Sequence, residues 1–304
     1  MPEITAGTVW IGREDEKDLH LAYTAYGRRT ASMHVLLVHG LFDDRRTWKD
    51  LLSHLPQDDR YVVAVDLLGA GQSSHPHLQH LPPDERYGAD LHVQYLQRLV
   101  SELGLCNLVL VGSSLGGGIV LRMLCVPWSD RPTLLGLILE GAAAYNHQIP
   151  LMMRQLAAPA GRLLMVEWIR KQAGKLGLAR RTVDRSIRRC FFDPGTAAPD
   201  LADRYLEILD SSRAIHAYRE TVRNLVPADM EKVVQRYCHI DMPTLVCWGQ
   251  NDQIISPLYG QRLVADIAGA QLTLIEDCGH APHLEQPARM AHAMDTWLSR
   301  LDRH

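Results

Sequence analysis

Short apolar runs alternate with longer amphipathic stretches through the first half of the chain and again near its end. The runs are bounded by Gly or Asp and are rich in β-branched and aliphatic residues, which is typical of buried strands. We expect eight strands, near residues 8–12, 19–26, 34–38, 61–65, 108–111, 134–139, 244–248 and 272–275. Apolar positions with a 3.6-residue period predict helices near residues 47–55, 90–104, 115–124, 258–267 and 283–301. The alternation predicts an α/β protein with a mostly parallel sheet, whose first two strands form an antiparallel hairpin.

Residues 142–240 break this alternation. They contain no convincing buried strand and instead string together amphipathic helices, such as residues 151–174 and 200–225. Because the stretch lies between two predicted core strands, it would emerge at the carboxyl edge of the sheet, where open α/β sheets bind ligands. We therefore expect a core formed by residues 1–141 and 241–304 and a helical cap formed by residues 142–240. Four apolar cap residues are candidates to line a substrate pocket or to pack the cap on the core: Leu151, Met152, Met153 and Trp168.

Composition narrows the class of protein without naming a partner. A hydrophobic fraction of 46% and a charged fraction of 22% in 304 residues are ordinary for a globular protein, and a net charge of -3 argues against nucleic acid. The six cysteines form no C-x-x-C pair, which favours a reduced compartment. The first twenty residues lack a signal-peptide pattern, and no window has the roughly 18 to 20 apolar residues of a membrane span. We expect a cytoplasmic protein without cofactor or metal.

The segment "LVLVGSSLGGGIV" at residues 108–120 carries the first candidate chemistry. Gly112, Ser114 and Gly116 form a G-x-S-x-G pattern after an apolar strand and before a helical run, the context of a nucleophile turn. Small flanking residues let the chain pass through a sharp turn and leave the Ser114 hydroxyl exposed. The N–H of Leu115, at the start of the following helix, is the first expected oxyanion donor. Ser113 lacks the symmetric glycine flanks and is expected to be a packing residue.

A second oxyanion donor is expected in "HVLLVHGLFDDRRTW" at residues 34–48. Gly40 permits a close backbone approach, so the N–H of Leu41 can face the same oxygen as that of Leu115. We interpret His39 as a structural histidine that bonds to the backbone. The glycine-rich segment at residues 66–74 lacks the lysine of a phosphate-binding loop, and we interpret it as a scaffold loop beside the nucleophile turn.

Two polar turns near the end of the chain complete a catalytic set. Asp252 follows the apolar run of "PTLVCWGQNDQIISP", and His280 follows that of "LTLIEDCGHAPHLEQP". The order Ser, Asp, His places each residue after a different parallel strand, so that the three can converge at one sheet edge. Serine ionises too weakly near neutral pH to attack unaided, a histidine can take its proton, and a carboxylate fixes the tautomer of that histidine. We expect Ser114 as nucleophile, His280 as general base and Asp252 as the orienting acid.

Together these segments resemble the α/β-hydrolase-fold enzymes of the capped esterase, haloperoxidase, C–C hydrolase and epoxide hydrolase neighbourhood. The resemblance spans nearly the whole chain and is carried by "HGLF", "DLLGAGQSS", "GSSLGG", "GQNDQIISP" and "GHAPHLEQP", at residues 39–42, 66–74, 112–117, 249–257 and 279–287. It implies an eight-stranded, mostly parallel sheet flanked by helices with a helical cap insertion. For the cap, the resemblance is limited to its place in the chain and its helical character.

Some residues offer rival assignments. Glu140 is the rival acid, because some members of the resembled family carry the carboxylate after the preceding strand, and His283 is the rival base. We favour Asp252 and His280 over them. His75, His77 and His80 lack familiar metal-ligand spacing and are interpreted as part of a solvated loop. The basic residues 170–189 are interpreted mainly as a solvated helix face, with attraction of an anionic substrate or membrane surface as the alternative.

The resemblance also orders the candidate reactions. A serine at position 114 argues against epoxide hydrolases and haloalkane dehalogenases, which carry aspartate there. C–C hydrolases usually have asparagine where this chain has Ser113 and an aromatic residue where it has Ala281. Ester hydrolysis through an acyl-serine therefore ranks first, C–C hydrolysis second, and lactone, thioester or perhydrolysis remain open. A non-catalytic receptor of this fold would be expected to have lost part of the triad. The expected partner is a small ester or related acyl substrate.

Overall fold

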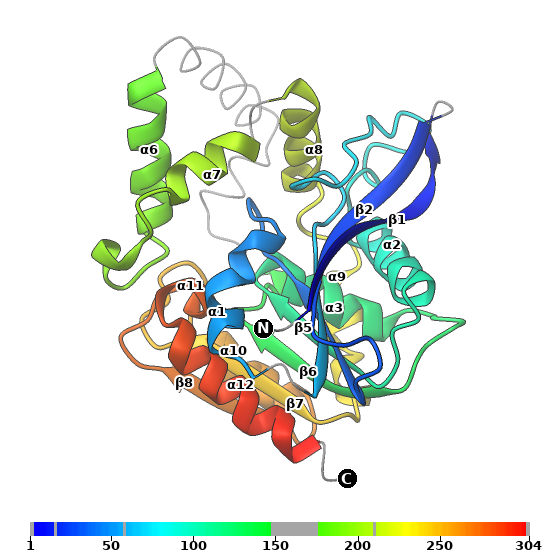
Figure 1. Cartoon of the computed structure of the whole chain (residues 1–304), viewed down its shortest axis with the longest axis vertical. Coiled ribbons are helices and arrows are strands. Elements are labelled where there is room, and N and C mark those ends of the chain that lie inside the picture. Colours follow the sequence, from blue (N-terminus) through cyan, green and yellow to red (C-terminus); the bar gives the residue numbers. More distant parts are fainter. Residues whose placement is uncertain (1–2, 15–16, 57–58, 147–175, 209–210, 302–304) are drawn as a thin grey trace.

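An eight-stranded sheet forms the centre of the computed structural model, which describes residues 3–14, 17–56, 59–146, 176–208 and 211–301 (Figure 1). The spatial order of its strands is β1-β2-β4-β3-β5-β6-β7-β8. In chain order they are β1 Ile4–Glu14, β2 Lys17–Tyr26, β3 Met33–Val38, β4 Arg60–Val65, β5 Leu108–Ser113, β6 Leu134–Glu140, β7 Thr244–Gly249 and β8 Gln271–Ile275. All eight predicted strands are confirmed, and the first is longer than expected.

The sheet is antiparallel only at its beginning. β1 pairs with β2, and β2 with β4, in antiparallel register, whereas every pair from β3 onward is parallel. Parallel neighbours place their carboxyl ends at the same edge of the sheet. The chain segments that follow β3, β5, β6, β7 and β8 therefore all start from this edge.

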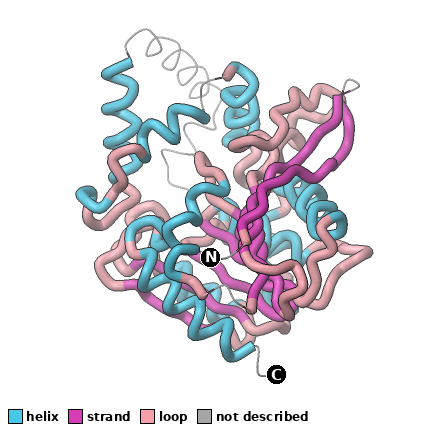
Figure 2. Tube along the Cα trace, in the orientation of Figure 1, coloured by secondary structure: helices cyan, strands magenta, loops and turns pink. Residues whose placement is uncertain are grey.

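Alternate strand residues face two separate apolar layers, because side chains in a strand alternate between the faces of the sheet. Val35 and Leu37 belong to a buried cluster with Met294 and Trp297. The helices on that face are α1 Lys49–His54 and α12 Pro287–Leu301. The opposite face is covered by α2 Ala89–Glu102, α3 Leu115–Cys125 and α10 Leu258–Asp266, whose apolar residues join Leu36 and Val38 in a larger cluster. Figure 2 shows the helices on either side of the strands. The predicted α/β layering is confirmed.

Two predicted helices differ in detail from the structure. The helix expected over residues 283–301 is two helices, α11 Pro282–Glu285 and α12, because Pro287 has no N–H to continue the first and Gln286 leaves the helical conformation. The helix expected over residues 47–55 begins as a 3₁₀ turn, η1 Arg45–Trp48, before α1. The side chain of Asp44 caps that turn by accepting from the N–H of Arg46.

Helices and turns fill the described residues between β6 and β7, and none of these residues forms a strand. Figure 1 shows α6, α7 and α8 grouped on the side of the molecule away from α12. Leu151, Met152, Met153 and Trp168 lie outside the described residues. No helix of the described part is long and apolar enough to cross a membrane. The elements of this region are α6 Leu176–Arg188, η3 Pro194–Thr196, α7 Leu201–Ile208, α8 Ser212–Arg223, α9 Met230–Val234 and η4 Tyr237–His239.

Candidate active site

Ser114 occupies a strained turn between β5 and α3. Its backbone has φ 50° and ψ −115°, a conformation that L-residues rarely adopt and that costs on the order of 1–3 kcal/mol. Hydrogen bonds on both sides hold it there: its N–H donates to the carbonyl of Glu140 at 2.8 Å, and its carbonyl accepts from the N–H of Ala143 at 2.9 Å. The turn is thus fixed by the end of the neighbouring strand β6.

The glycines around Ser114 are sterically required. A Cβ on Gly116 would lie 2.3 Å from the carbonyl oxygen of Val38, and one on Gly112 would lie 2.5 Å from that of Gly116. Both obstacles are backbone atoms, which cannot rotate away. Gly116 is therefore required by the close packing of α3 against the end of β3, and Gly112 by the close approach of α3 to the end of β5.

The loops that carry Asp252 and His280 are joined to each other directly. The N–H of Asn251 donates to the carbonyl of Cys278 at 2.9 Å, and a Cβ on Gly249 would lie 1.8 Å from the carbonyl oxygen of Gly279. The two loops follow the adjacent parallel strands β7 and β8. Strand order and this contact therefore bring two side chains that are 28 residues apart into the same place.

A continuous chain of hydrogen bonds links Ser114, His280 and Asp252. The Ser114 Oγ lies 3.1 Å from His280 Nε2, and His280 Nδ1 lies 2.8 Å from Asp252 Oδ2. The other carboxylate oxygen of Asp252 accepts from the N–H groups of Ile254 at 2.8 Å and Ile255 at 2.9 Å. An ionised carboxylate can only accept, so one at this position would keep the His280 proton on Nδ1 and would leave Nε2 as the acceptor that faces Ser114.

The backbone segments of the two expected oxyanion donors run beside Ser114. A Cβ on Gly40 would be 3.2 Å from the Cβ of Ser114, so the backbone before Leu41 passes directly beside the candidate nucleophile. Leu115 is the first residue of α3, where helical N–H groups have no intrahelical acceptor. Among the described residues His39 bonds only to the backbone, as expected: its Nε2 accepts from the N–H of Leu67 at 3.0 Å, and its Nδ1 lies 2.8 Å from the carbonyl of Gly40.

The scaffold interpretation of the loop after β4 also agrees with the contacts. Asp66 is fully buried and accepts from the N–H of Arg45 at 2.7 Å and from the N–H of Gln72 at 2.8 Å. Its carboxylate also pairs with the guanidinium of Arg45. These bonds tie the loop to the segment that follows β3.

The rival residues Glu140 and His283 form a separate buried array. One oxygen of Glu140 accepts from the N–H of His283 at 2.9 Å and lies 2.8 Å from His283 Nδ1, while His283 Nε2 lies 2.7 Å from the Thr47 hydroxyl. Burial alone would lower the pKa of His283, but the Glu140 carboxylate outweighs it and the pKa is raised. Neither rival hydrogen-bonds to the side chains of Ser114, His280 or Asp252, so the array serves to connect loops.

Several contributors to the site escaped sequence reasoning. Glu285 is buried and accepts from the N–H of Gly279 at 2.6 Å and from that of Asp193 at 2.8 Å, which fixes the loop before His280. The N–H of His280 donates to the carbonyl of Cys190 at 2.6 Å. Glu285 could have been singled out, because it lies in the segment "GHAPHLEQP" that carries the family resemblance and His280. Backbone contacts such as that of Cys190 leave none, because any residue type supplies the same carbonyl.

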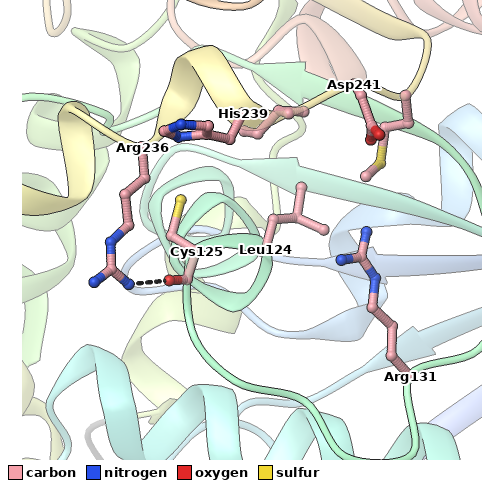
Figure 3. Close-up of a pocket in the computed structure, with 8 residues that line it drawn as sticks. Leu124, Cys125, Arg131, Arg236, His239 and Asp241 are labelled. Atoms are coloured by element: carbon pink, nitrogen blue, oxygen red, sulfur yellow. Dashed lines mark hydrogen bonds between the residues drawn. The ribbon is translucent and has the colours of Figure 1, made fainter.

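A separate cavity of about 410 Å³ opens near the other end of α3 (Figure 3). Leu124 and Cys125, the last residues of the helix whose N-cap is Ser114, form part of its wall, and an 11-residue helix is about 16 Å long. The cavity is therefore distinct from the candidate active site. Its remaining lining residues are Arg131, Arg236, His239, Ile240, Asp241 and Met242.

Comparison with known proteins assigns the family. A model of the alpha/beta hydrolase fold matches residues 33–287, so the chain belongs to the α/β-hydrolase family. It is 27% identical over 274 residues to an uncharacterized protein of Mycobacterium tuberculosis, covering 87% of this chain and 74% of that protein. It is 24% identical over 299 residues to monoacylglycerol lipase abhd6-B of Xenopus laevis, covering 92% and 79%.

A solved structure shows the same fold over the full length of both chains. The 2-hydroxy-6-oxo-6-phenylhexa-2,4-dienoate hydrolase of a Rhodococcus species superposes with a TM-score of 0.75, at 19% identity and 100% coverage of each chain. The family match and the likeness to a lipase support a hydrolase as the class of this protein.

Proposed function

We propose that the protein is a serine hydrolase that cleaves carboxylic esters through an acyl-serine intermediate. The single observation that carries this proposal is the hydrogen-bonded chain Ser114–His280–Asp252, with Ser114 in a strained turn at the start of α3. Ser114 is the nucleophile, His280 the general base and Asp252 the acid that orients it. The N–H groups of Leu41 and Leu115 stabilise the oxyanion.

The reaction follows from these roles. Ser114 Oγ attacks the ester carbonyl carbon while His280 Nε2 takes its proton, and negative charge collects on the carbonyl oxygen. The tetrahedral intermediate expels the alcohol, which receives the proton from His280. Water then attacks the acyl-serine with His280 again as base, which releases the acid and restores Ser114.

Ester hydrolysis is supported by the lipase relative, because an ester is what a lipase cleaves. C–C hydrolysis is the second candidate, since the Rhodococcus neighbour is a dienoate hydrolase, but a likeness at 19% identity extends only to the fold. Water as acyl acceptor is the simplest case, and lactone, thioester and peroxide chemistry use the same acyl-enzyme.

We also propose that residues 142–240 form a cap over the site. Contacts from this region to the core loops support it: the carbonyl of Cys190 accepts from the N–H of His280, and Glu207 of α7 pairs with Arg46 at 2.9 Å. Arg204 of α7 also lies 3.3 Å from the Asp43 carboxylate.

The test combines a covalent label with a substrate panel. A fluorophosphonate should modify Ser114, as peptide mapping would show, and p-nitrophenyl esters of rising acyl length should be turned over. A ring-fission dienoate and a lactone belong in the same panel. Ser114→Ala should abolish labelling and turnover together. Label on a different serine, or ester turnover that survives Ser114→Ala, would defeat the assignment, and faster dienoate than ester cleavage would favour the second candidate.

A further inference from the structure

The hydroxyl of Tyr218 has no hydrogen-bond partner among the residues that the structure describes, although the residue is only 5% exposed. A buried hydroxyl loses its bonds to water, and buried tyrosine hydroxyls usually have a replacement partner. Two other buried tyrosines follow that rule: Tyr87 donates to the carbonyl of Pro76 at 2.5 Å and Tyr237 to that of Ala144 at 2.9 Å. The unpaired hydroxyl of Tyr218 therefore has to be explained by the surroundings of this residue.

That position is beside the candidate active site. The Tyr218 ring stacks on Phe42, with ring centroids 3.6 Å apart and planes 26° apart. Phe42 is the second residue after Gly40, whose backbone lies against Ser114, and it has a positive φ of 64°. Tyr218 thus rests on the segment that carries the proposed oxyanion donor Leu41.

A neighbouring contact holds α8 in place, so the ring is not free to leave. Ala217 packs against the scaffold loop so closely that a Cβ on Gly69 would lie 2.7 Å from the Cβ of Ala217. Figure 1 shows α8 on the same side of the molecule as α7. The Tyr218 ring is therefore held by its stacking on Phe42 and by the close packing of its neighbour Ala217 against the scaffold loop.

The hydroxyl is suited to donate rather than to carry charge. Burial raises the pKa of Tyr218 well above its usual value, so the group stays protonated. A protonated hydroxyl on a fixed ring can donate to an oxygen without the cost of ordering a flexible side chain.

We propose that Tyr218 is a specificity-determining residue whose hydroxyl donates a hydrogen bond to a substrate oxygen outside the ester group that reacts. The inference rests on the proposed function and narrows its substrate class to esters whose acyl or alcohol part carries an additional acceptor oxygen. A plain alkyl ester would leave the hydroxyl unpaired, and a site that holds an unpaired buried polar group discriminates against such a substrate.

The test compares wild type and Tyr218→Phe on two pairs of isosteric esters. One pair places the oxygen in the acyl part, p-nitrophenyl 3-methoxypropanoate against p-nitrophenyl pentanoate. The other places it in the alcohol part, 2-methoxyethyl butyrate against butyl butyrate. The variant should lower kcat/KM for the oxygen-bearing member of one pair by about 5- to 10-fold, the value of one neutral hydrogen bond, and leave its CH₂ counterpart nearly unchanged. Intrinsic ester reactivity cancels in the ratio of variant to wild-type kcat/KM. The pair that responds shows whether Tyr218 contacts the acyl part or the alcohol part of the substrate.

Tyr237→Phe is the matched control, because Tyr237 is also buried but its hydroxyl already has a partner. It should lower Tm and affect both members of each pair equally, whereas Tyr218→Phe should leave Tm unchanged or raise it. Equal losses on both members in both pairs, or a fall in Tm like that of Tyr237→Phe, would overturn the inference while ester hydrolysis stands. If the wild type hydrolyses none of the four esters, the proposed function fails and the inference falls with it.

Discussion

Replacing Asp252 by Asn tests whether this carboxylate sets the tautomer of His280. The carboxylate uses its two oxygens differently: Oδ1 accepts from the N–H groups of Ile254 and Ile255, and Oδ2 faces His280 Nδ1 at 2.8 Å. An asparagine has one oxygen and one NH₂ group. Since the two backbone N–H groups require an acceptor, the oxygen should stay with them and the NH₂ should face His280.

The consequence is that His280 adopts the other imidazole tautomer. An NH₂ group facing Nδ1 forces that nitrogen to accept, so the ring proton moves to Nε2, which then cannot take the proton of Ser114. Loss of the orienting carboxylate in this way lowers kcat by about three to four powers of ten, or about 4 to 5 kcal/mol of transition-state stabilisation. The two backbone donors keep the loop in place, so KM and the fold should change little.

Glu140→Gln is the matched control, because it is also an isosteric change at a fully buried carboxylate next to a histidine. We expect it to reduce kcat by less than about tenfold. Steady-state kinetics on one p-nitrophenyl ester, together with circular dichroism of each variant, measures both effects. The reasoning is refuted if Asp252→Asn retains near-wild-type kcat, and a reversal of the two effects would move the acid to the end of β6.

Three further predictions concern the surroundings of the site. The pKa of His283 is raised, so its pairing with Glu140 contributes its full stability below the usual histidine pKa of about 6.5 and loses it as pH rises through the folded-state pKa. The free energy of unfolding in urea, measured from pH 6 to 9, should show this decline in wild type and not in Glu140→Gln. The same pH dependence in both proteins would contradict the prediction. Gly116→Ala should lower kcat by on the order of 100-fold, because its Cβ would meet backbone oxygen at 2.3 Å and shift the start of α3; an active variant with native Tm would show that the helix tolerates the methyl group. Exchanging residues 142–240 for the equivalent region of a related hydrolase should change the chain-length preference in kcat/KM while fluorophosphonate labelling persists, and an unchanged ester profile in a folded chimera would place the pocket in the core loops.

Much of the architecture was predictable because it depends on local patterns. Buried parallel strands must be continuously apolar and helices must repeat every 3.6 residues, so each element is visible in its own segment. The Ser114 turn was predictable for the same reason, since its flanking glycines are adjacent in sequence. Asp252 and His280 could be placed because each lies in the loop that follows a strand, and parallel strands end at a common edge.

The contacts between distant segments could not be predicted, because they depend on how helices and loops pack in three dimensions. Nothing in the sequence around Thr47 indicates that its hydroxyl lies 2.7 Å from His283, 236 residues later. The same is true of Tyr218, an ordinary residue of an amphipathic helix until the fold stacks it on Phe42. The sequence by itself therefore determined the fold class and the candidate triad. Only the tertiary structure decided that Glu140 pairs with His283 and Asp252 with His280, because this pairing depends on how segments distant in sequence pack against one another.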